Sequence, residues 1–309
     1  MQEQLQGGHP SVLAIVTISQ GSSPGRQGFK LLITETSTLG TVGGGVMEAK
    51  IITQAREMIA NHQTTPILRE LLHHRNATDE KRSGLFCSGS QIVILVPLQK
   101  DDLKTINQFI ASYDSSSKEY LEVSQDGLTL IYQSEQEISW DMKDETDFKY
   151  IERVGNPNTV YIFGAGHVGS AISQALTPLD FKIVLIDPRA QLPDLDRTYH
   201  ELHTIPYSRS HEVVKTGERS YVLVVTSERV TDEKVLNSLQ HGKFKFIGLM
   251  GSKTKIRFIF DKLKEQGVSE SYINSIQAPI GIGIPNESPE EIGVSVVAQL
   301  ISVRHARKH

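Results

Sequence analysis

The fold of the second half of the chain is decided by residues 159–169, which read TVYIFGAGHVG. The apolar and β-branched residues 159–163 predict a buried strand, and a Gly-x-Gly-x-x-Gly pattern follows it at the start of a helix expected over 168–176. In this setting the glycines allow a tight turn, a close approach of the backbone to a phosphate, and close packing of helix on strand. The stretch therefore predicts a Rossmann-like βαβ unit.

Strand and helix patterns continue to alternate after this unit, which predicts a doubly wound parallel sheet with helices on its faces. The further strands are expected over 182–186, 220–225 and 245–249, and the further helices over 232–239 and 254–266. A last helix should begin at Ser288-Pro289-Glu290-Glu291, a capping box with proline at the first helical position. This helix, expected to end near Arg304, is apolar on more than one side, so we expect it to be deeply buried or part of a subunit interface.

The glycine turn and the end of the second strand supply the first group of candidate cofactor-binding residues. Asp187 ends the strand at the place where a carboxylate accepts hydrogen bonds from a ribose, and Arg189 would suit a 2′-phosphate. NAD(P) is one ligand that fits, and the alternative is a sheet that keeps its glycines for packing alone. The candidates in this group are Gly164, Gly166, His167, Gly169 and Asp187.

A second glycine turn, Gly251-Ser252-Lys253, lies between an expected strand and an expected helix. Backbone amides, a hydroxyl and an ammonium at a helix start suit an anionic group. We therefore include Gly251, Ser252 and Lys253 among the candidate cofactor-binding residues. The lysines that follow on this helix are expected to form a solvated face.

The first half of the chain shows weaker but readable patterns. Strands are expected over 12–18, 29–34 and 92–98, and a helix up to about Asn61. Three consecutive glycines, Gly43, Gly44 and Gly45, precede this helix and would let a ligand approach the backbone. Glu48 follows them as a candidate catalytic base, and its alternative role is a first-turn glutamate favoured by the helix dipole.

Cys87 is the single cysteine of the chain, so no intrachain disulfide and no site made of several thiolates can form. It lies in a glycine-flanked turn, where a thiol is more reachable as a thiolate than in a buried element. Cys87 is therefore the second candidate catalytic residue. The histidines, including His73-His74, show no metal-ligand spacing, and we predict no structural metal.

Length and charge limit the classes of function. A chain of 309 residues predicts about two domains, and a polar stretch from about residue 100 to 158 suggests domains over 1–150 and 151–309. Because the chain has 32 basic and 36 acidic residues, it has no excess of positive charge, and we expect no nucleic-acid partner. No apolar run is long enough to cross a bilayer and the first basic residue is Arg26, so we expect no membrane association, no signal peptide and a cytoplasmic location.

Taken in order, these motifs resemble the XdhC/CoxI family over about residues 9–99 and 158–304. The motifs that carry the resemblance are the Gly21–Gly25 loop, Gly43-Gly44-Gly45-x-x-Glu48, Cys87-x-Gly89, Gly164–Gly169 with His167, Ile247–Lys253, and Pro279–Ile282 before Ser288–Ile292. Val46, Ser88 and Arg229 stand where many members of the family have cysteine, glycine and histidine, so a role that needs a second thiol or that histidine is not expected.

The resemblance implies an N-terminal mixed α/β XdhC/CoxI domain, a C-terminal Rossmann-like domain, and the work of an accessory factor for xanthine dehydrogenase or a related molybdenum hydroxylase. It implies a protein that binds the molybdenum cofactor, a molybdopterin, and assists its sulfuration and insertion, as a maturation factor more than an enzyme. The partners would be the hydroxylase client and a cysteine desulfurase, and we expect a homodimer. Cys87, Glu48 and the glycine loops become the site candidates by position.

The main alternative is an NAD(P)-dependent oxidoreductase. That activity needs a general acid near the nicotinamide, and His167 is too close to the pyrophosphate turn for this role. A scaffolding protein without a small ligand would leave the first-domain glycines unexplained.

Overall fold

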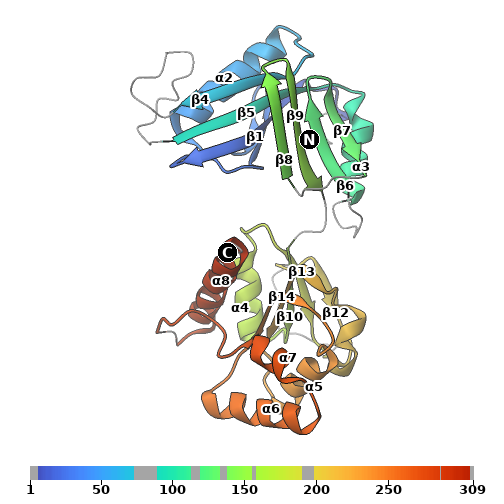
Figure 1. Ribbon diagram of the computed structural model, residues 1–309, viewed down its shortest axis with the longest axis vertical. Helices are drawn as coiled ribbons and strands as arrows, with labels where there is room; N and C mark the ends of the chain where they lie inside the picture. The colour runs from blue at the N-terminus through green and yellow to red at the C-terminus, as the bar shows by residue number, and fades with distance from the viewer. Residues whose placement is uncertain are drawn as a thin grey trace. The chain divides into compact units, whose positions relative to one another are not determined.

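The computed structural model describes residues 6–72, 89–112, 119–132, 138–154, 158–189, 198–285 and 287–306. The chain divides into two compact units, Met1–Asn156 and Pro157–His309, shown in Figure 1. The division falls near the boundary that the polar stretch suggests.

Unit 1 contains a five-stranded antiparallel sheet in the order β3-β2-β1-β5-β4. Its strands are β1 (Ser11–Gly21), β2 (Lys30–Thr34), β3 (Thr38–Gly40), β4 (Ile67–Leu72) and β5 (Gly89–Leu98). Helix α2 (Gly45–Ala60) follows the glycine loop and buries its apolar stripe on this sheet. The three strands and the helix expected in this half of the chain are all present, while β3 and β4 are additions.

An uninterrupted run of apolar residues along β1 makes both faces of this sheet apolar, because successive side chains point to opposite faces. Val12, Ala14 and Val16 pack with α2, whereas Leu13 and Ile15 belong to a core on the opposite face. Successive side chains of a strand point to opposite faces, so a fully apolar strand requires a covering layer on each side. A second layer must therefore cover the face that α2 leaves open.

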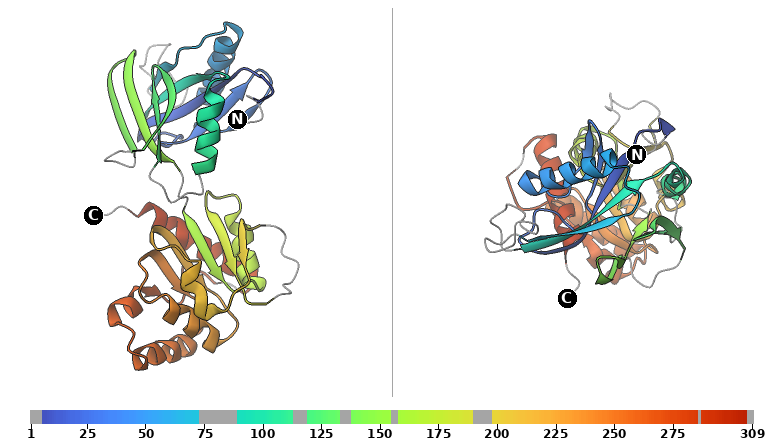
Figure 2. Two further views of the ribbon diagram at one scale, coloured as in Figure 1. Left: turned by 90° about the vertical axis from the view of Figure 1, so that its right-hand side faces the viewer. Right: turned by 90° about the horizontal axis from the view of Figure 1, so that it is seen from above.

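That layer is a four-stranded antiparallel sheet in the order β7-β6-β9-β8, built from the polar stretch. It comprises β6 (Glu119–Ser124), β7 (Gly127–Ile131), β8 (Ile138–Asp144) and β9 (Asp147–Val154), and helix α3 (Asp102–Ser112) precedes it; Figure 2 gives a second view. The sequence predicted only weak strands here, because one face of the sheet carries most of the apolar residues. Phe148 and Tyr150 are examples: they lie two residues apart on β9 and are both buried in the core shared with β1.

Unit 2 is a six-stranded parallel sheet in the order β12-β11-β10-β13-β14-β15, the doubly wound order of a Rossmann fold. Its strands are β10 (Thr159–Phe163), β11 (Lys182–Ile186), β12 (Glu201–His203), β13 (Gly217–Val224), β14 (Phe244–Leu249) and β15 (Ile276–Gln277). The fold class that the sequence predicts is confirmed, and the expected strands are displaced by at most a few residues.

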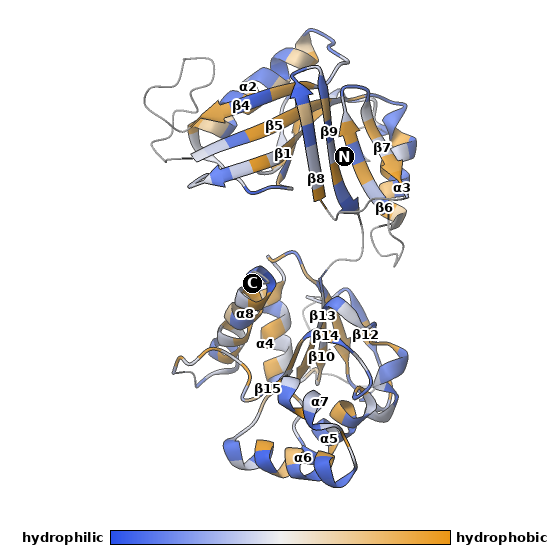
Figure 3. Ribbon diagram, viewed as in Figure 1, coloured by the Kyte–Doolittle hydropathy of each residue, from blue (hydrophilic) through white to orange (hydrophobic). Residues whose placement is uncertain are grey.

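Helices cover both faces of this sheet. One face carries α5 (Arg229–Ser238), α6 (Lys253–Glu265), α7 (Glu270–Ser275) and the short 3-10 helix η1 (Tyr207–Glu212), and the other carries α4 (His167–Leu176) and α8 (Pro289–His305). In Figure 3, hydrophilic and hydrophobic residues alternate along α6, as expected of a helix with one buried face.

Helix α8 begins with the expected capping box, in which Ser288 accepts from the amide of Glu291 and the Glu291 side chain accepts from the amide of Ser288. Its residues Val296, Val297 and Leu300 are buried within unit 2, whereas Val294 is exposed. Packing inside the unit therefore accounts for most of the apolar character of this helix. Within the part of the chain that the structure describes, no helix has the length and apolar character needed to cross a membrane.

Candidate functional site

A cavity of about 490 Å³ opens at the carboxyl edge of the parallel sheet, where β10, β11 and β13 end and α4 and α5 begin. This is the place where ligands bind in open α/β sheets. The residues that line it are Gly164, Gly166, His167, Val168, Asp187, Pro188, Arg189, Tyr207, Val225, Thr226, Ser227, Glu228, Thr231 and Met250.

The three glycines of the first turn serve three different purposes. A Cβ on Gly169 would lie 1.9 Å from the carbonyl oxygen of Gly164, so this glycine is required for helix α4 to approach the turn. Gly164 has φ +104°, and its Cβ would lie 2.9 Å from the carbonyl oxygen of Val225. Gly166, by contrast, has an ordinary φ of −81° and no atom within 4 Å of its Cβ position. The protein's own packing therefore does not require glycine at 166, where the cavity begins.

The N-terminus of α4 faces the same space. Gly166 is its N-cap residue and makes no side-chain cap, so the first amides of the helix have no side-chain acceptor from that position. His167, the first helical residue, is exposed and lines the cavity. Free amides at a helix start, with the positive end of the helix dipole, suit an anionic group.

Asp187 lines the cavity as expected, but its carboxylate is already engaged by the protein. The guanidinium of Arg189 donates two hydrogen bonds to it, from Nε to Oδ1 at 2.8 Å and from Nη2 to Oδ2 at 2.7 Å. The amides of Ala165 and Arg189 donate to the same carboxylate at 2.8 and 3.0 Å. Burial acts to raise the pKa of Asp187, yet these bonds hold it below the ordinary value. Asp187 therefore fixes Arg189 at the cavity, and the half-exposed guanidinium is the group that a ligand meets.

The second glycine turn is built differently from the anion site that the sequence suggests. The hydroxyl of Ser252 caps α6 by accepting from the amide of Lys255 at 3.2 Å. Lys253 is exposed and, like Ser252, is not among the residues that line the cavity. A Cβ on Gly251 would lie 2.8 Å from Cδ of Lys255, so the turn leaves space for the Lys255 side chain.

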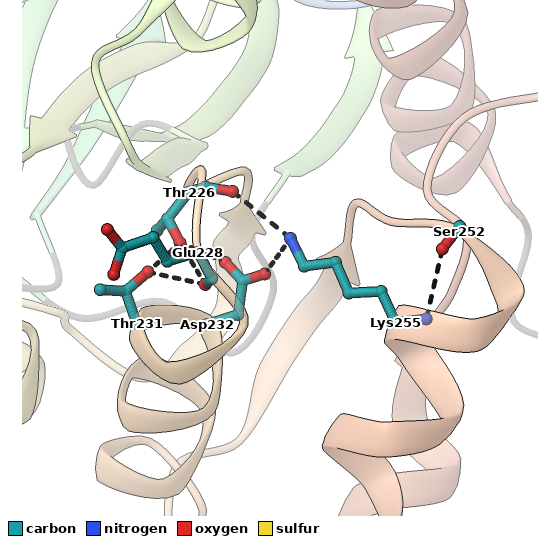
Figure 4. Close-up of polar contacts among 6 residues, drawn as sticks. All are labelled: Thr226, Glu228, Thr231, Asp232, Ser252 and Lys255. Carbon is teal, nitrogen blue, oxygen red and sulfur yellow. Dashed lines mark hydrogen bonds and ion pairs between the residues drawn. The ribbon is translucent and has the colours of Figure 1, made fainter.

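Lys255 reaches across this turn into a buried cluster beside the cavity, shown in Figure 4. Its Nζ lies 2.5 Å from Oδ2 of Asp232, a fully buried residue at the start of α5, and donates to the carbonyl oxygen of Thr226 at 3.4 Å. The hydroxyl of Thr226 donates to Oδ1 of Asp232 at 2.5 Å. Burial raises the pKa of Asp232, although Lys255 and Thr226 offset part of the effect.

The sequence did not single out Asp232, Lys255, Thr226 or Thr231 as site residues. A usable signal was present, because Thr226 follows a buried strand, and Thr231 and Asp232 lie at the start of the next helix, at the edge where α/β sheets bind ligands. Nothing local to Lys255 separates it from the other lysines of α6.

In unit 1, Glu48 holds the glycine loop together. Its Oε2 accepts from the hydroxyl of Thr41 at 2.6 Å and from the amides of Val42 and Gly44 at 2.8 and 3.0 Å. Gly44 and Gly45 have φ of +75° and +67°, and a Cβ on Gly43 would lie 2.5 Å from the amide nitrogen of Gly25. These contacts describe a capping carboxylate, the alternative role that the sequence left open for Glu48.

Glu48→Gln is expected to lower the free energy of unfolding at neutral pH by about 1 kcal/mol, as for the loss of a helix cap. Burial acts to raise the pKa of Glu48, but the Thr41 hydroxyl and the amides of Val42, Gly44 and Gly43 bring it below its ordinary value of 4.5. A lowered pKa stabilises the fold above the ordinary value, and this stability is lost as the pH falls through the lowered one. Urea unfolding should therefore show a difference between the two proteins at pH 7 that shrinks below about pH 4. A difference independent of pH would contradict the capping role.

Cys87 and His73-His74 lie outside the described residues. Gly89, the first described residue after Cys87, packs closely on the Gly21–Gly25 loop, since its Cβ would lie 2.9 Å from the carbonyl carbon of Ser22. Among the described residues, no group of three or more His, Cys, Asp or Glu side chains could hold a metal ion.

Family models match both units. The XdhC Rossmann domain model matches residues 160–300, and the XdhC and CoxI family model matches residues 4–71. The expected resemblance is therefore confirmed over the second unit and the first part of the first.

Curated relatives are distant and longer. YqeB of Escherichia coli K12 is 26% identical over 300 residues, which cover 96% of this chain and 44% of YqeB. A Bacillus subtilis 168 protein, named as a probable subunit of xanthine dehydrogenase, is 25% identical over 163 residues, which cover 52% of this chain and 47% of that protein. The chain thus matches less than half the length of each of these relatives.

A crystal structure from Bacillus halodurans, described as that of a xanthine dehydrogenase, has the same fold. It superposes with a TM-score of 0.76 at 21% identity, covering 100% of this chain and 96% of that one. At this identity the likeness shows the fold alone.

Proposed function

The chain belongs to the XdhC and CoxI family, and from this membership we propose that it is a maturation factor for a xanthine dehydrogenase-type molybdenum hydroxylase. In this role it binds the molybdenum cofactor in the cavity at the carboxyl edge of the parallel sheet and assists the cofactor's sulfuration and insertion into the client. When bound, the cofactor supplies the redox centre that the client needs, while this chain supplies the binding site.

One observation carries the proposal: Gly166 lines the cavity and its missing side chain is explained by no contact of the protein itself. Glycine at a helix start lets the backbone approach a phosphate, which molybdopterin carries. The amides of α4 and the guanidinium of Arg189 supply donors around that place. These residues fit a phosphate-bearing cofactor, and they would hold its phosphate.

The remaining parts of the proposal rest on the family. A cysteine desulfurase as the sulfur donor and a contact of Cys87 with the cofactor are predictions of that membership. Cytoplasmic location and a homodimeric state stay predictions from the sequence. In unit 1, Gly43, Gly44 and Gly45 stay candidates for a cofactor contact, with Glu48 as the residue that shapes their loop.

Gly166→Val is expected to weaken molybdopterin binding at least tenfold, because the valine side chain would enter the space that the phosphate needs. The cost to stability should stay within about 1 kcal/mol, since only a helix-cap position changes. Titration of the purified chain of residues 1–309 measures the affinity, and activation of the apo-hydroxylase client in the same preparation measures the function.

Gly283→Val is the matched control, because this glycine also has no atom within 4 Å of its Cβ position and does not line the cavity. It should bind molybdopterin like the wild type. Equal affinity of the Gly166→Val variant would contradict the site. Tight NADH or NADPH binding, with turnover of about 1 per second or more and no molybdopterin binding, would favour the oxidoreductase alternative.

A further inference from the structure

The stability of the fold does not by itself explain why Asp232 and Lys255 form an ion pair at a buried position. Asp232 has no exposed surface, and Lys255 is 17% exposed at its side chain. The removal of two charges from water costs free energy that their attraction repays only in part, and apolar side chains of similar volume serve a fold as well or better. The role of the pair is therefore better sought in the groups that it holds in place than in the stability of unit 2.

The pair holds the turn between β13 and α5, which forms one wall of the cavity. Lys255 binds the carbonyl oxygen of Thr226 and Asp232 binds its hydroxyl, so Thr226 is fixed at both its backbone and its side chain. The hydroxyl of Thr231 donates to the carbonyl oxygen of Glu228 at 2.7 Å and closes the turn. Both threonine hydroxyl protons are thus directed into the protein.

The two sides of the cavity consequently differ in hydrogen-bonding character. We use the name acceptor wall for Glu228 and Thr231, which both line the cavity. The Glu228 carboxylate is the main acceptor, because the Thr231 hydroxyl also contacts the hydroxyl of Thr226 at 2.5 Å. Figure 4 shows the Glu228 carboxylate pointing away from the Asp232–Lys255 pair. The other side carries donors, namely the amides at the start of α4 and the guanidinium of Arg189.

We propose that Glu228 is a specificity-determining residue and that Asp232 and Lys255, through Thr226, are positioning residues for the turn that carries it. The acceptor wall then binds the N–H edge of a 2-amino-4-oxopyrimidine ring in a phosphate monoester. A carboxylate accepts from a ring N–H and its adjacent amino group together, as carboxylates accept from paired donors generally. Pterins and guanine share this edge, whereas adenine presents an acceptor nitrogen there. The inference rests on the proposed function and adds the feature by which the cavity selects its ligand.

GMP and AMP test the proposal, because both are purine phosphate monoesters and they differ at this edge. Calorimetric titration of the wild-type chain should give a dissociation constant for GMP at least tenfold lower than for AMP. Glu228→Met should bring the ratio near one by weakening GMP and leaving AMP unchanged. Glu270→Met, at the start of α7 and absent from the cavity lining, should leave the ratio as in the wild type.

The double variant Asp232→Leu/Lys255→Met separates positioning from stability. Its melting temperature should stay close to that of the wild type, because an apolar pair replaces a charged one, yet its GMP:AMP selectivity should fall below threefold. Wild-type selectivity in this double variant would overturn the positioning role. Equal binding of the two nucleotides by the wild type, or no binding of GMP at millimolar concentration, would overturn the assignment of Glu228.

These outcomes are distinct from failure of the proposed function. If GMP selectivity is present but molybdopterin neither binds nor reaches a client, the acceptor wall stands and the maturation role fails. If molybdopterin binds with equal affinity to the wild type and to Glu228→Met, the role stands and the acceptor wall fails.

Discussion

Lys255→Met alone is expected to lower the free energy of unfolding by about 3 to 5 kcal/mol, the usual consequence of leaving a buried charge without its partner. Asp232 has no exposed surface and would lose the ammonium 2.5 Å from its carboxylate. The expected result is a steep loss of stability confined to unit 2, which contains β13, α5 and α6.

Circular dichroism during urea unfolding is the suitable measurement, because the single tryptophan, Trp140, lies in unit 1 and does not report on unit 2. Lys253→Met is the matched control, since Lys253 is exposed at the start of the same helix and should cost less than about 0.5 kcal/mol. A Lys255→Met protein as stable as this control would show that Asp232 is not a buried partner of Lys255.

Gly169→Ala is expected to cost about 3 kcal/mol even though alanine favours helices more than glycine does. The new methyl group would lie 1.9 Å from the carbonyl oxygen of Gly164, which belongs to the backbone of a tight turn and cannot rotate away. Helix α4 would have to move off the turn. Hydrogen exchange of the amides in β10 and α4, read by mass spectrometry, should rise locally in this variant.

Gly166→Ala makes the same chemical change three residues earlier on the same turn, where no atom lies within 4 Å of the new methyl group. Its stability should stay within about 1 kcal/mol of the wild type. If the two alanine variants unfold at the same urea concentration, the division of roles among the glycines is wrong.

Most strands and helices of unit 2 could be predicted from the sequence because each has a local signature. The apolar run before Gly164 forms β10, and the Ser288 to Glu291 capping box starts α8 as expected. For the four-stranded sheet of unit 1 the sequence predicts only weak strands, since β8 has no buried residue and gives little periodic signal. The hydrogen-bond and ion-pair partners of individual side chains were harder to predict, because they depend on how helices and strands pack against one another.

The sequence by itself determined the βαβ order, the position of the glycine turn and the family, because hydrophobic period, turn glycines and helix caps act over a few neighbouring residues. Only the tertiary structure decided that Asp187 binds Arg189, that Glu48 caps its own loop, and that Lys255 rather than Lys253 reaches the cavity's wall. The physical reason is that Asp232 and Lys255 lie on different helices, and packing of α5 and α6 on one face of the sheet sets their distance. No local pattern encodes that distance.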